Sequence, residues 1–218
     1  IGSVLFYGFQ QDSQRYFSDP MAWLAVWDGG MSFHGGFLGV LLAVVIWSRF
    51  NPKTRFWEVT DLLAISAPIG LFFGRIANFI NGELYGRPTD VPWAMRFPTF
   101  GPNGVKDQWT EPRHPSQLYE SFLEGLVLLI VLNVMWRNPA IRDRAGIVTG
   151  GFMAGYGFFR FLVEFVRKPD NGIEAGFFKF AGLGTFTTGQ ELSFPMIIAG
   201  VALMLWRRNQ TPAGTPAP

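Results

Sequence analysis

Cysteine is absent from this 218-residue chain, and histidine occurs only twice. The absence of cysteine excludes disulfide bonds, a thiolate nucleophile and cysteine-ligated metals, and two histidines are too few for a histidine-rich metal site. Charged residues are also scarce, at 16% of the chain against about 25% in soluble domains. The net charge of +2, with scattered arginines, gives no indication of nucleic-acid binding.

Apolar residues make up 49% of the chain and aromatic residues 17%. The mean hydropathy is positive, and this composition predicts an integral membrane protein. We predict an all-α, polytopic transmembrane helical bundle. Five segments have close to the length that a bilayer requires, at about residues 35–50, 61–80, 118–136, 146–166 and 192–206.

The two ends of the chain differ from this central part. Residues 1–9 have the composition of the end of an apolar helix whose beginning lies upstream, and the tryptophan-rich residues 20–27 suit a helix at the headgroup level. We predict one membrane domain over residues 1–208 and a disordered tail over residues 209–218.

Glycine spacing indicates where the helices come close together. The pairs Gly35/Gly39, Gly70/Gly74 and Gly151/Gly155 each place two small residues one turn apart, which lets a neighbouring backbone approach. We find no internal repeat of the kind that builds many transporters.

Five spans alternate in direction, so that every second loop lies on the same side of the membrane. The distinctive polar residues all fall at span ends that share one side, namely His34, residues 75–83 and 113–120, Tyr156, Arg160, Glu164, Gln190 and Glu191. The opposite ends carry ordinary basic loops, and the weight of short basic loops in the positive-inside rule places those loops in the cytoplasm. We therefore expect the polar residues to converge at the outer leaflet.

The most informative stretch is residues 74–86. Arg75 and Asn78 share a helix face, and Asn81 repeats the same spacing. A charge within hydrocarbon costs at least ~2.5–3.5 kcal/mol, so it normally has a partner or a function. Arginine offers a planar fork that suits phosphate, which indicates a pocket for an anionic group at the membrane surface. The alternative is that these polar groups only hold helices together.

A second polar stripe lies on the fourth predicted span. Tyr156, Arg160 and Glu164 follow one another at intervals of four residues, and Arg160 is the second candidate ligand for a phosphate. Two arginines from different helices would clamp a phosphodiester and stabilise charge on a phosphate leaving group. The alternative is a self-contained Arg160–Glu164 ion pair, in which Glu164 orients Arg160.

Two further segments carry titratable or hydrogen-bonding groups. His34 opens the first span, and its imidazole can either take a proton from a nucleophile or simply bond to a neighbour. Gln117, Glu120 and Glu124 share one face of the third span, where Glu124 needs a buried cationic partner and the acids favour a structural salt-bridge cluster. Residues 82–112 form a loop long enough to be an arm over the site.

Four blocks of sequence together resemble one family, the bacterial prolipoprotein diacylglyceryl transferases. Residues 74–86 are similar to the family signature Gly-Arg-x-x-Asn-Phe-x-Asn-x-Glu-x-x-Gly, and residues 27–36, 113–120 and 156–165 are similar to three further blocks. The resemblance runs in family order from about residue 1 to residue 207. Members of the family begin with further spans upstream, where they place functional residues that include a tyrosine.

The resemblance implies a reaction and its partners. The diacylglyceryl group of phosphatidylglycerol would be joined, by a thioether, to the lipobox cysteine in a prolipoprotein signal peptide, and glycerol phosphate would be released. The nucleophile would be the substrate's thiol, which suits a chain without cysteine. No cofactor and no metal is implied. Family topology implies a multi-pass protein of the bacterial inner membrane, with a periplasmic active site and loop region and a cytoplasmic C-terminus.

The resemblance also implies roles for individual residues. Arg75 and Arg160 would bind the headgroup phosphate, and His34 would help to deprotonate the thiol. The pocket would be shaped by Asn78, Asn81, Glu83, Gly86 and Tyr156, with support from Glu164 and Arg167. Two other readings stay open from the residues themselves, an anion transporter or channel lined by Arg75, Arg160 and Glu164, and a structural scaffold.

Overall fold

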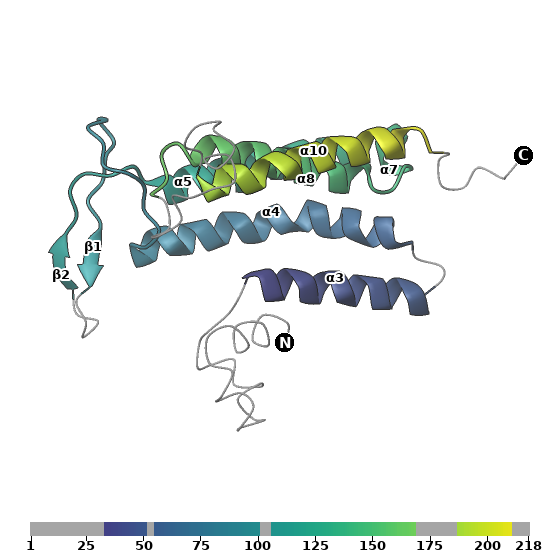
Figure 1. Cartoon of the computed structure of the whole chain (residues 1–218), viewed down its shortest axis with the longest axis horizontal. Helices are drawn as coiled ribbons and strands as arrows, with labels where there is room; N and C mark the ends of the chain where they lie inside the picture. Colours follow the sequence, from purple (N-terminus) through teal and green to yellow (C-terminus); the bar gives the residue numbers. More distant parts are fainter. Residues whose placement is uncertain (1–32, 52–54, 101–105, 169–186, 211–218) are drawn as a thin grey trace, which may run out of the picture. The chain divides into compact units, whose positions relative to one another are not determined.

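The computed structural model describes residues 33–51, 55–100, 106–168 and 187–210 (Figure 1). The predicted upstream helix end at residues 1–9, the interfacial helix at 20–27 and most of the predicted tail lie outside these residues. The elements in chain order are α3 (Phe33–Phe50), α4 (Phe56–Asn81), β1 (Pro98–Phe100), β2 (Lys106–Trp109), α5 (Ser116–Glu120), the π-helix η3 (Ser121–Val127), α6 (Leu128–Arg137), α7 (Pro139–Arg142), α8 (Ile147–Val163) and α10 (Thr188–Arg208).

Helices make up most of the described chain, as the sequence predicts. Three helical stretches are long and apolar enough to cross a membrane, namely Phe56–Asn81, the continuous α5–η3–α6 stretch Ser116–Arg137, and Gly189–Arg208. Two apolar helices are shorter, Gly36–Phe50 and Ile147–Val163. Large apolar side chains such as Phe73, Val134 and Leu192 are exposed, as expected for helices that face lipid. The chain is thus a helical membrane protein.

Helix α8 packs closely against α10, and glycines make this approach possible (Figure 1). A Cβ added at Gly200 would lie 2.5 Å from the backbone nitrogen of Ala154 and 2.6 Å from the backbone oxygen of Gly150. The predicted pair Gly151/Gly155 also faces a neighbouring helix, because Cβ atoms there would lie 2.7 Å from side-chain atoms of α6. The prediction for Gly70/Gly74 was wrong within the described residues, since Cβ atoms at both positions would meet nothing within 4 Å.

A small apolar core lies between α6, α8 and α4. Leu128, Leu132 and Val148 are almost fully buried there, with Ala64 beside them. Gly125 of η3 brings that helix against α4, because its Cβ would lie 2.7 Å from the Cα of Phe72. This close contact holds the third predicted span against the C-terminal half of α4, where the signature stretch begins.

Among the described residues, the two named strands lie in the loop from residue 82 to residue 112. Strands β1 and β2 pair antiparallel, with Pro98 opposite Trp109 and Thr99 opposite Gln108. The all-α prediction therefore needs a correction, because a β-hairpin lies inside this loop. Pairing of backbone groups between the two strands satisfies hydrogen bonds that a long unstructured loop would leave to water.

The contacts divide the chain into two compact units, residues 1–59 and residues 60–218. The first unit contains α3 and the first turn of α4, and the second contains all the other described elements. All the residues of the polar cluster described below belong to the second unit. The predicted single domain over residues 1–208 stays a prediction.

Candidate functional site

Arg75 lies near the C-terminus of α4, at the end of an apolar helix face. Its Nε atom forms an ion pair of 2.7 Å with Oε2 of Glu120, and its Nη1 donates to Oδ1 of Asn78 at 3.4 Å. The Arg75 side chain is 19% exposed. One edge of the guanidinium is thus held by α5 and by the next turn of α4, while part of the group remains accessible.

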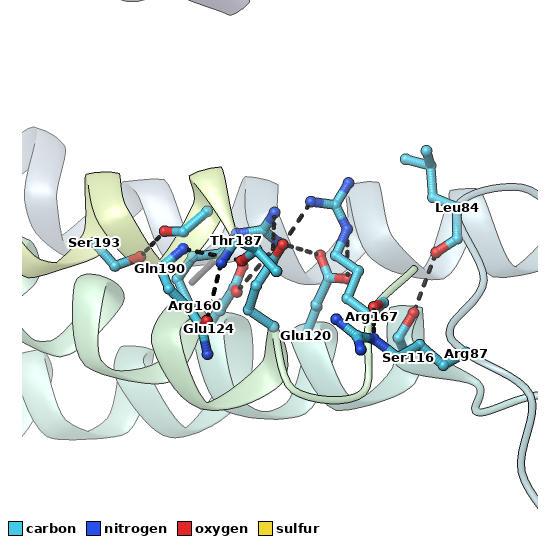
Figure 2. A network of polar contacts seen from close by, with 12 residues as sticks. Leu84, Arg87, Ser116, Glu120, Glu124, Arg160, Arg167, Thr187, Gln190 and Ser193 are labelled. Carbon is cyan, nitrogen blue, oxygen red and sulfur yellow. Dashed lines mark hydrogen bonds and ion pairs between the residues drawn. The ribbon is translucent and has the colours of Figure 1, made fainter. Parts of the chain in front are cut away.

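Glu120 is the centre of the polar cluster (Figure 2). Besides Arg75, its Oε2 contacts Nη1 of Arg160 at 3.3 Å, and its Oε1 lies 3.8 Å from Nε of Arg167. The Glu120 side chain is 1% exposed. One buried carboxylate therefore gathers three guanidinium groups from α4, α8 and the segment that follows α8. A buried charge of this kind is stable only because it is paired.

Glu164 connects two of these arginines from the other side. Its Oε2 lies 3.3 Å from Nη2 of Arg160 and 3.9 Å from Nη1 of Arg167. The predicted Arg160–Glu164 pair is therefore present, although it is not self-contained, because Arg160 also contacts Glu120. The start of α10 approaches the same carboxylate, since a Cβ at Gly189 would lie 2.6 Å from Cδ of Glu164.

The signature loop after α4 is organised around Glu83. Its Oε1 accepts hydrogen bonds from the side-chain amides of Asn78 at 2.8 Å and Asn81 at 3.2 Å. The backbone oxygens of Glu83 and Leu84 accept from Nε2 of Gln117 and Oγ of Ser116, at 2.6 Å and 3.2 Å. The loop is thus attached to the start of α5, where Glu120 lies one turn further on.

Gly86 is the point where the signature loop crosses two other segments. Its N–H donates to the backbone oxygen of His114 at 2.9 Å, and it forms a β-bridge with Arg167. A Cβ at this position would lie 2.5 Å from the backbone oxygen of Val166 and 2.8 Å from that of His114. Only glycine leaves room for this crossing. The neighbouring Arg87 donates from Nε to the backbone oxygen of Arg167 at 2.8 Å, which fixes the backbone that carries the third arginine.

Of the two remaining predicted site residues, Tyr156 lies beside the cluster and His34 has a side chain outside the described residues. Tyr156 is half-buried one turn before Arg160, with its ring stacked on Phe152 at a centroid distance of 5.8 Å. His34 belongs to the first turn of α3, and its side chain lies outside the described part of the chain. The structure therefore brings together Arg75, Asn78, Asn81, Glu83, Gly86, Arg160, Glu164 and Arg167.

Sequence reasoning missed the central position of Glu120, which it assigned to a structural salt-bridge cluster together with Glu124. The signal was present, because Gln117, Glu120 and Glu124 lie on one face of an otherwise apolar helix. The sequence pattern does not show which residues pair with these acids. Those partners come from residues 45 positions earlier and 40 positions later, so that only tertiary contacts reveal them.

The chemistry of this arrangement suits an anion. Three guanidinium groups lie at one end of the bundle in a largely buried environment, where charge-assisted hydrogen bonds to oxyanions are strong. Within the described residues, no group of three His, Cys, Asp or Glu side chains has the arrangement of a metal site.

Comparison with known sequences identifies the family. A family model for prolipoprotein diacylglyceryl transferase matches residues 1–206. The chain belongs to the prolipoprotein diacylglyceryl transferase family.

Several members of this family are about half identical to the chain. The phosphatidylglycerol–prolipoprotein diacylglyceryl transferase of Photobacterium profundum is 49% identical over 216 residues, which cover 97% of this chain and 71% of the relative. The protein of the same name from Vibrio vulnificus is 52% identical, over 94% of this chain and 68% of the relative. That of Azospirillum brasilense is 50% identical, over 98% and 73%. The resemblance carried by the four sequence blocks is therefore confirmed.

Proposed function

We propose that the chain transfers the diacylglyceryl group of phosphatidylglycerol to the lipobox cysteine of a prolipoprotein. A carbon–sulfur bond forms between the glyceryl carbon and the thiol, and the bond from that carbon to the phosphate oxygen breaks. Glycerol phosphate leaves with the electron pair of the broken bond, and the thiol loses its proton. The names of the transferases from Photobacterium, Vibrio and Azospirillum support this assignment.

One observation supports the site assignment most directly, the meeting of Arg75 and Arg160 on the carboxylate of Glu120. Two guanidinium groups from different helices converge there on one oxygen, Oε2 of Glu120, and would bind an oxygen of a phosphodiester in the same way. Charge on the leaving phosphate increases as the carbon–oxygen bond breaks. Fixed guanidinium groups stabilise that charge without having to reorganise during the reaction.

The remaining residues would act around these two arginines. His34 would help to remove the thiol proton. Asn78, Asn81 and Glu83 would hold the exposed side of Arg75. Gly86 would allow the signature loop to cross its neighbouring segments, and Tyr156 would form part of the apolar wall of the pocket. Glu164 and Arg167 would orient Arg160, which agrees with the distances of 3.3 Å and 3.9 Å from the Glu164 carboxylate to the two arginines.

We also propose how the protein sits in its membrane. Adding α3 and α8 to the three longer helical stretches would make five spans in the bacterial inner membrane. The cluster of Arg75, Glu120 and Arg160 would then face the periplasm, with the β-hairpin loop on the same side and the C-terminus in the cytoplasm. The short basic segments around Arg142, Arg144 and Arg207, at the other ends of the helices, support this orientation.

The test is direct transfer in a defined lipid. Purified protein in nanodiscs is incubated with phosphatidylglycerol and a lipobox peptide, and the peptide mass is followed. A gain of one diacylglyceryl group on the cysteine peptide, and none on a peptide with serine in its place, supports the proposal. A folded, reconstituted protein that never modifies the peptide would contradict it and leave the anion-transport reading, which a liposome flux assay tests.

Lysine substitutions at Arg75 and Arg160 test whether these two arginines bind the phosphate. Arg75→Lys and Arg160→Lys keep the charge but lose the planar fork, so each should lower kcat/KM by about 10²-fold or more. The matched control is Arg142→Lys, because Arg142 is half-exposed and its ion pair in the described chain is with the neighbouring Asp143. Activity in either cluster variant that equals that of the control would overturn the phosphate-binding role.

A further inference from the structure

Glu124 is the least compensated charge in the polar cluster. It lies in η3 and is completely buried. Its contact with Nη1 of Arg160 is long, at 4.0 Å, and neither of its carboxylate oxygens has a hydrogen-bond partner within the described residues. Glu120, one turn earlier, has an ion pair of 2.7 Å. A buried carboxylate without hydrogen bonds is costly when it is ionised, and far less costly when it carries a proton.

The net charge of the cluster around Glu124 depends on whether one of its carboxyl groups carries a proton. Among the described residues the cluster contains three guanidinium groups and three carboxyl groups, from Arg75, Arg160, Arg167, Glu120, Glu124 and Glu164. With all six ionised the net charge is zero, and a phosphodiester would add an uncompensated negative charge to a buried site. With one carboxyl neutral the cluster carries one positive charge, which matches a single phosphodiester.

The local fold places Glu124 in an unusual helical turn. The π-helical turn Ser121–Val127 widens the helix at this position, and π-turns of this kind are frequent at functional sites. The charged and titratable groups that face Glu124 are Arg75 from α4, Glu120 from α5, and Tyr156, Arg160 and Glu164 from α8 and its C-cap. Two guanidinium groups and two carboxyl groups thus surround a fully buried carboxyl group that has no hydrogen bond in the described chain.

We propose that Glu124 carries a proton when the arginine cluster holds the phosphodiester of the lipid, so that lipid and cluster together are electrically neutral. This inference rests on the proposed function and adds a charge-setting residue to it. Glu124 acts through Arg160 and is a positioning residue. When Glu124 loses its proton, its carboxylate attracts the Arg160 guanidinium more strongly, and Arg160 then binds the phosphate less tightly.

The first test compares pH profiles. Glu124→Gln has the shape of the neutral side chain, so this variant should transfer diacylglyceryl within about twofold of wild type at neutral pH. At alkaline pH the wild type should lose kcat/KM for phosphatidylglycerol relative to the variant, by up to about tenfold per pH unit. All other titrating groups are common to both proteins, so the ratio isolates Glu124. The control is Glu58→Gln, because the Glu58 carboxylate accepts from the Arg55 backbone N–H at the start of α4, and the wild-type-to-control ratio should not change with pH.

Two results would overturn the inference. One is a folded Glu124→Gln protein that is inactive at neutral pH, which would mean that the ionised carboxylate is needed. The other is a wild-type-to-variant ratio that does not change with pH. In both cases the wild type still performs transfer, so that the proposed function stands while this inference fails.

A second measurement uses the wild type alone and decides the matter if Glu124→Gln does not fold. Binding of short-chain phosphatidylglycerol is followed by calorimetry in two buffers of different ionisation enthalpy, at alkaline pH. Because a phosphodiester does not titrate there, uptake approaching one proton per bound lipid supports the inference. Binding without any proton uptake at every alkaline pH contradicts it.

Discussion

The carboxylate of Asp61 accepts a 2.7 Å hydrogen bond from the backbone N–H of Gly146, 85 positions further along the chain. It also accepts from the N–H of Thr149 at 2.7 Å and from its Oγ1 at 2.6 Å. Helix α8 has no capping side chain of its own, because Gly146 is its N-cap. Asp61 from α4 therefore replaces the missing cap and fixes the end of α8 that lies opposite Arg160.

This relationship predicts a large effect of Asp61→Ala on stability. The change leaves the backbone N–H groups of Gly146 and Thr149 without an acceptor, while Oγ1 of Thr149 keeps its hydrogen bond to Oγ1 of Thr60, and we expect a loss of about 2–3 kcal/mol. Unfolding in detergent, followed by the thermal midpoint, measures it. Asp143→Ala is the control, since the exposed Arg142–Asp143 pair contributes about 0.5 kcal/mol or less. Equal midpoints for the two variants would show that Asp61 does not hold α8.

Gly86→Ala tests the crossing of the signature loop. The added methyl group would overlap with backbone oxygens of Val166 and His114, so the backbone around Arg167 must move. We expect a stability loss of ~1–3 kcal/mol and a drop in transfer of about 10²-fold, because small displacements of charged groups are costly for catalysis.

The matched control for this change is Gly70→Ala. No atom lies within 4 Å of a Cβ at Gly70 among the described residues, and alanine is a better helix former by roughly 0.5–1 kcal/mol. This variant should keep wild-type activity and melt at an equal or slightly higher temperature. A Gly86→Ala protein that behaves like Gly70→Ala would refute the steric argument.

Glu120→Gln tests whether one carboxylate positions the arginines. The amide keeps the size of the side chain but removes the charge that draws Arg75 and Arg160 together. We expect kcat/KM to fall by about 10- to 100-fold in the transfer assay. Glu111→Gln, which alters a half-exposed pair with Arg113, should change it by about twofold or less.

A double variant separates positioning from a purely structural role. If Glu120 acts through Arg160, then adding Glu120→Gln to Arg160→Lys should cost much less than the product of the two single effects. Fully multiplicative effects in a folded double variant would mean that the two residues act independently.

The two asparagines of the signature should differ in importance. Asn78 contacts both Arg75 and Glu83, whereas Asn81 is exposed and contacts Glu83 at 3.2 Å. Net hydrogen-bond contributions of ~0.5–1.5 kcal/mol each then predict a fall of about tenfold or more in transfer for Asn78→Ala, and of about threefold for Asn81→Ala. Initial rates with the lipobox peptide measure both, and the reverse order would contradict this interpretation of the loop.

Much of the fold could be predicted from single segments. The sequence predicts spans at residues 61–80 and 118–136, and these residues lie within α4 and the α5–η3–α6 stretch, because a run of apolar residues of bilayer length has few alternatives to a helix. The sequence does not predict the paired strands Pro98–Phe100 and Lys106–Trp109, since they are three and four residues long and carry no clear alternation.

The sequence by itself determined that this is a helical membrane protein of the prolipoprotein diacylglyceryl transferase family. It also determined that Arg75 and Arg160 need partners, because an isolated charge in hydrocarbon is costly. Only the tertiary structure decided which groups are those partners. Glu120 joins Arg75, Arg160 and Arg167, while Glu124 nearby is left without a hydrogen bond in the described chain. Ion pairing depends on ångström distances between helices that are far apart in sequence, and a pattern along one helix does not contain those distances.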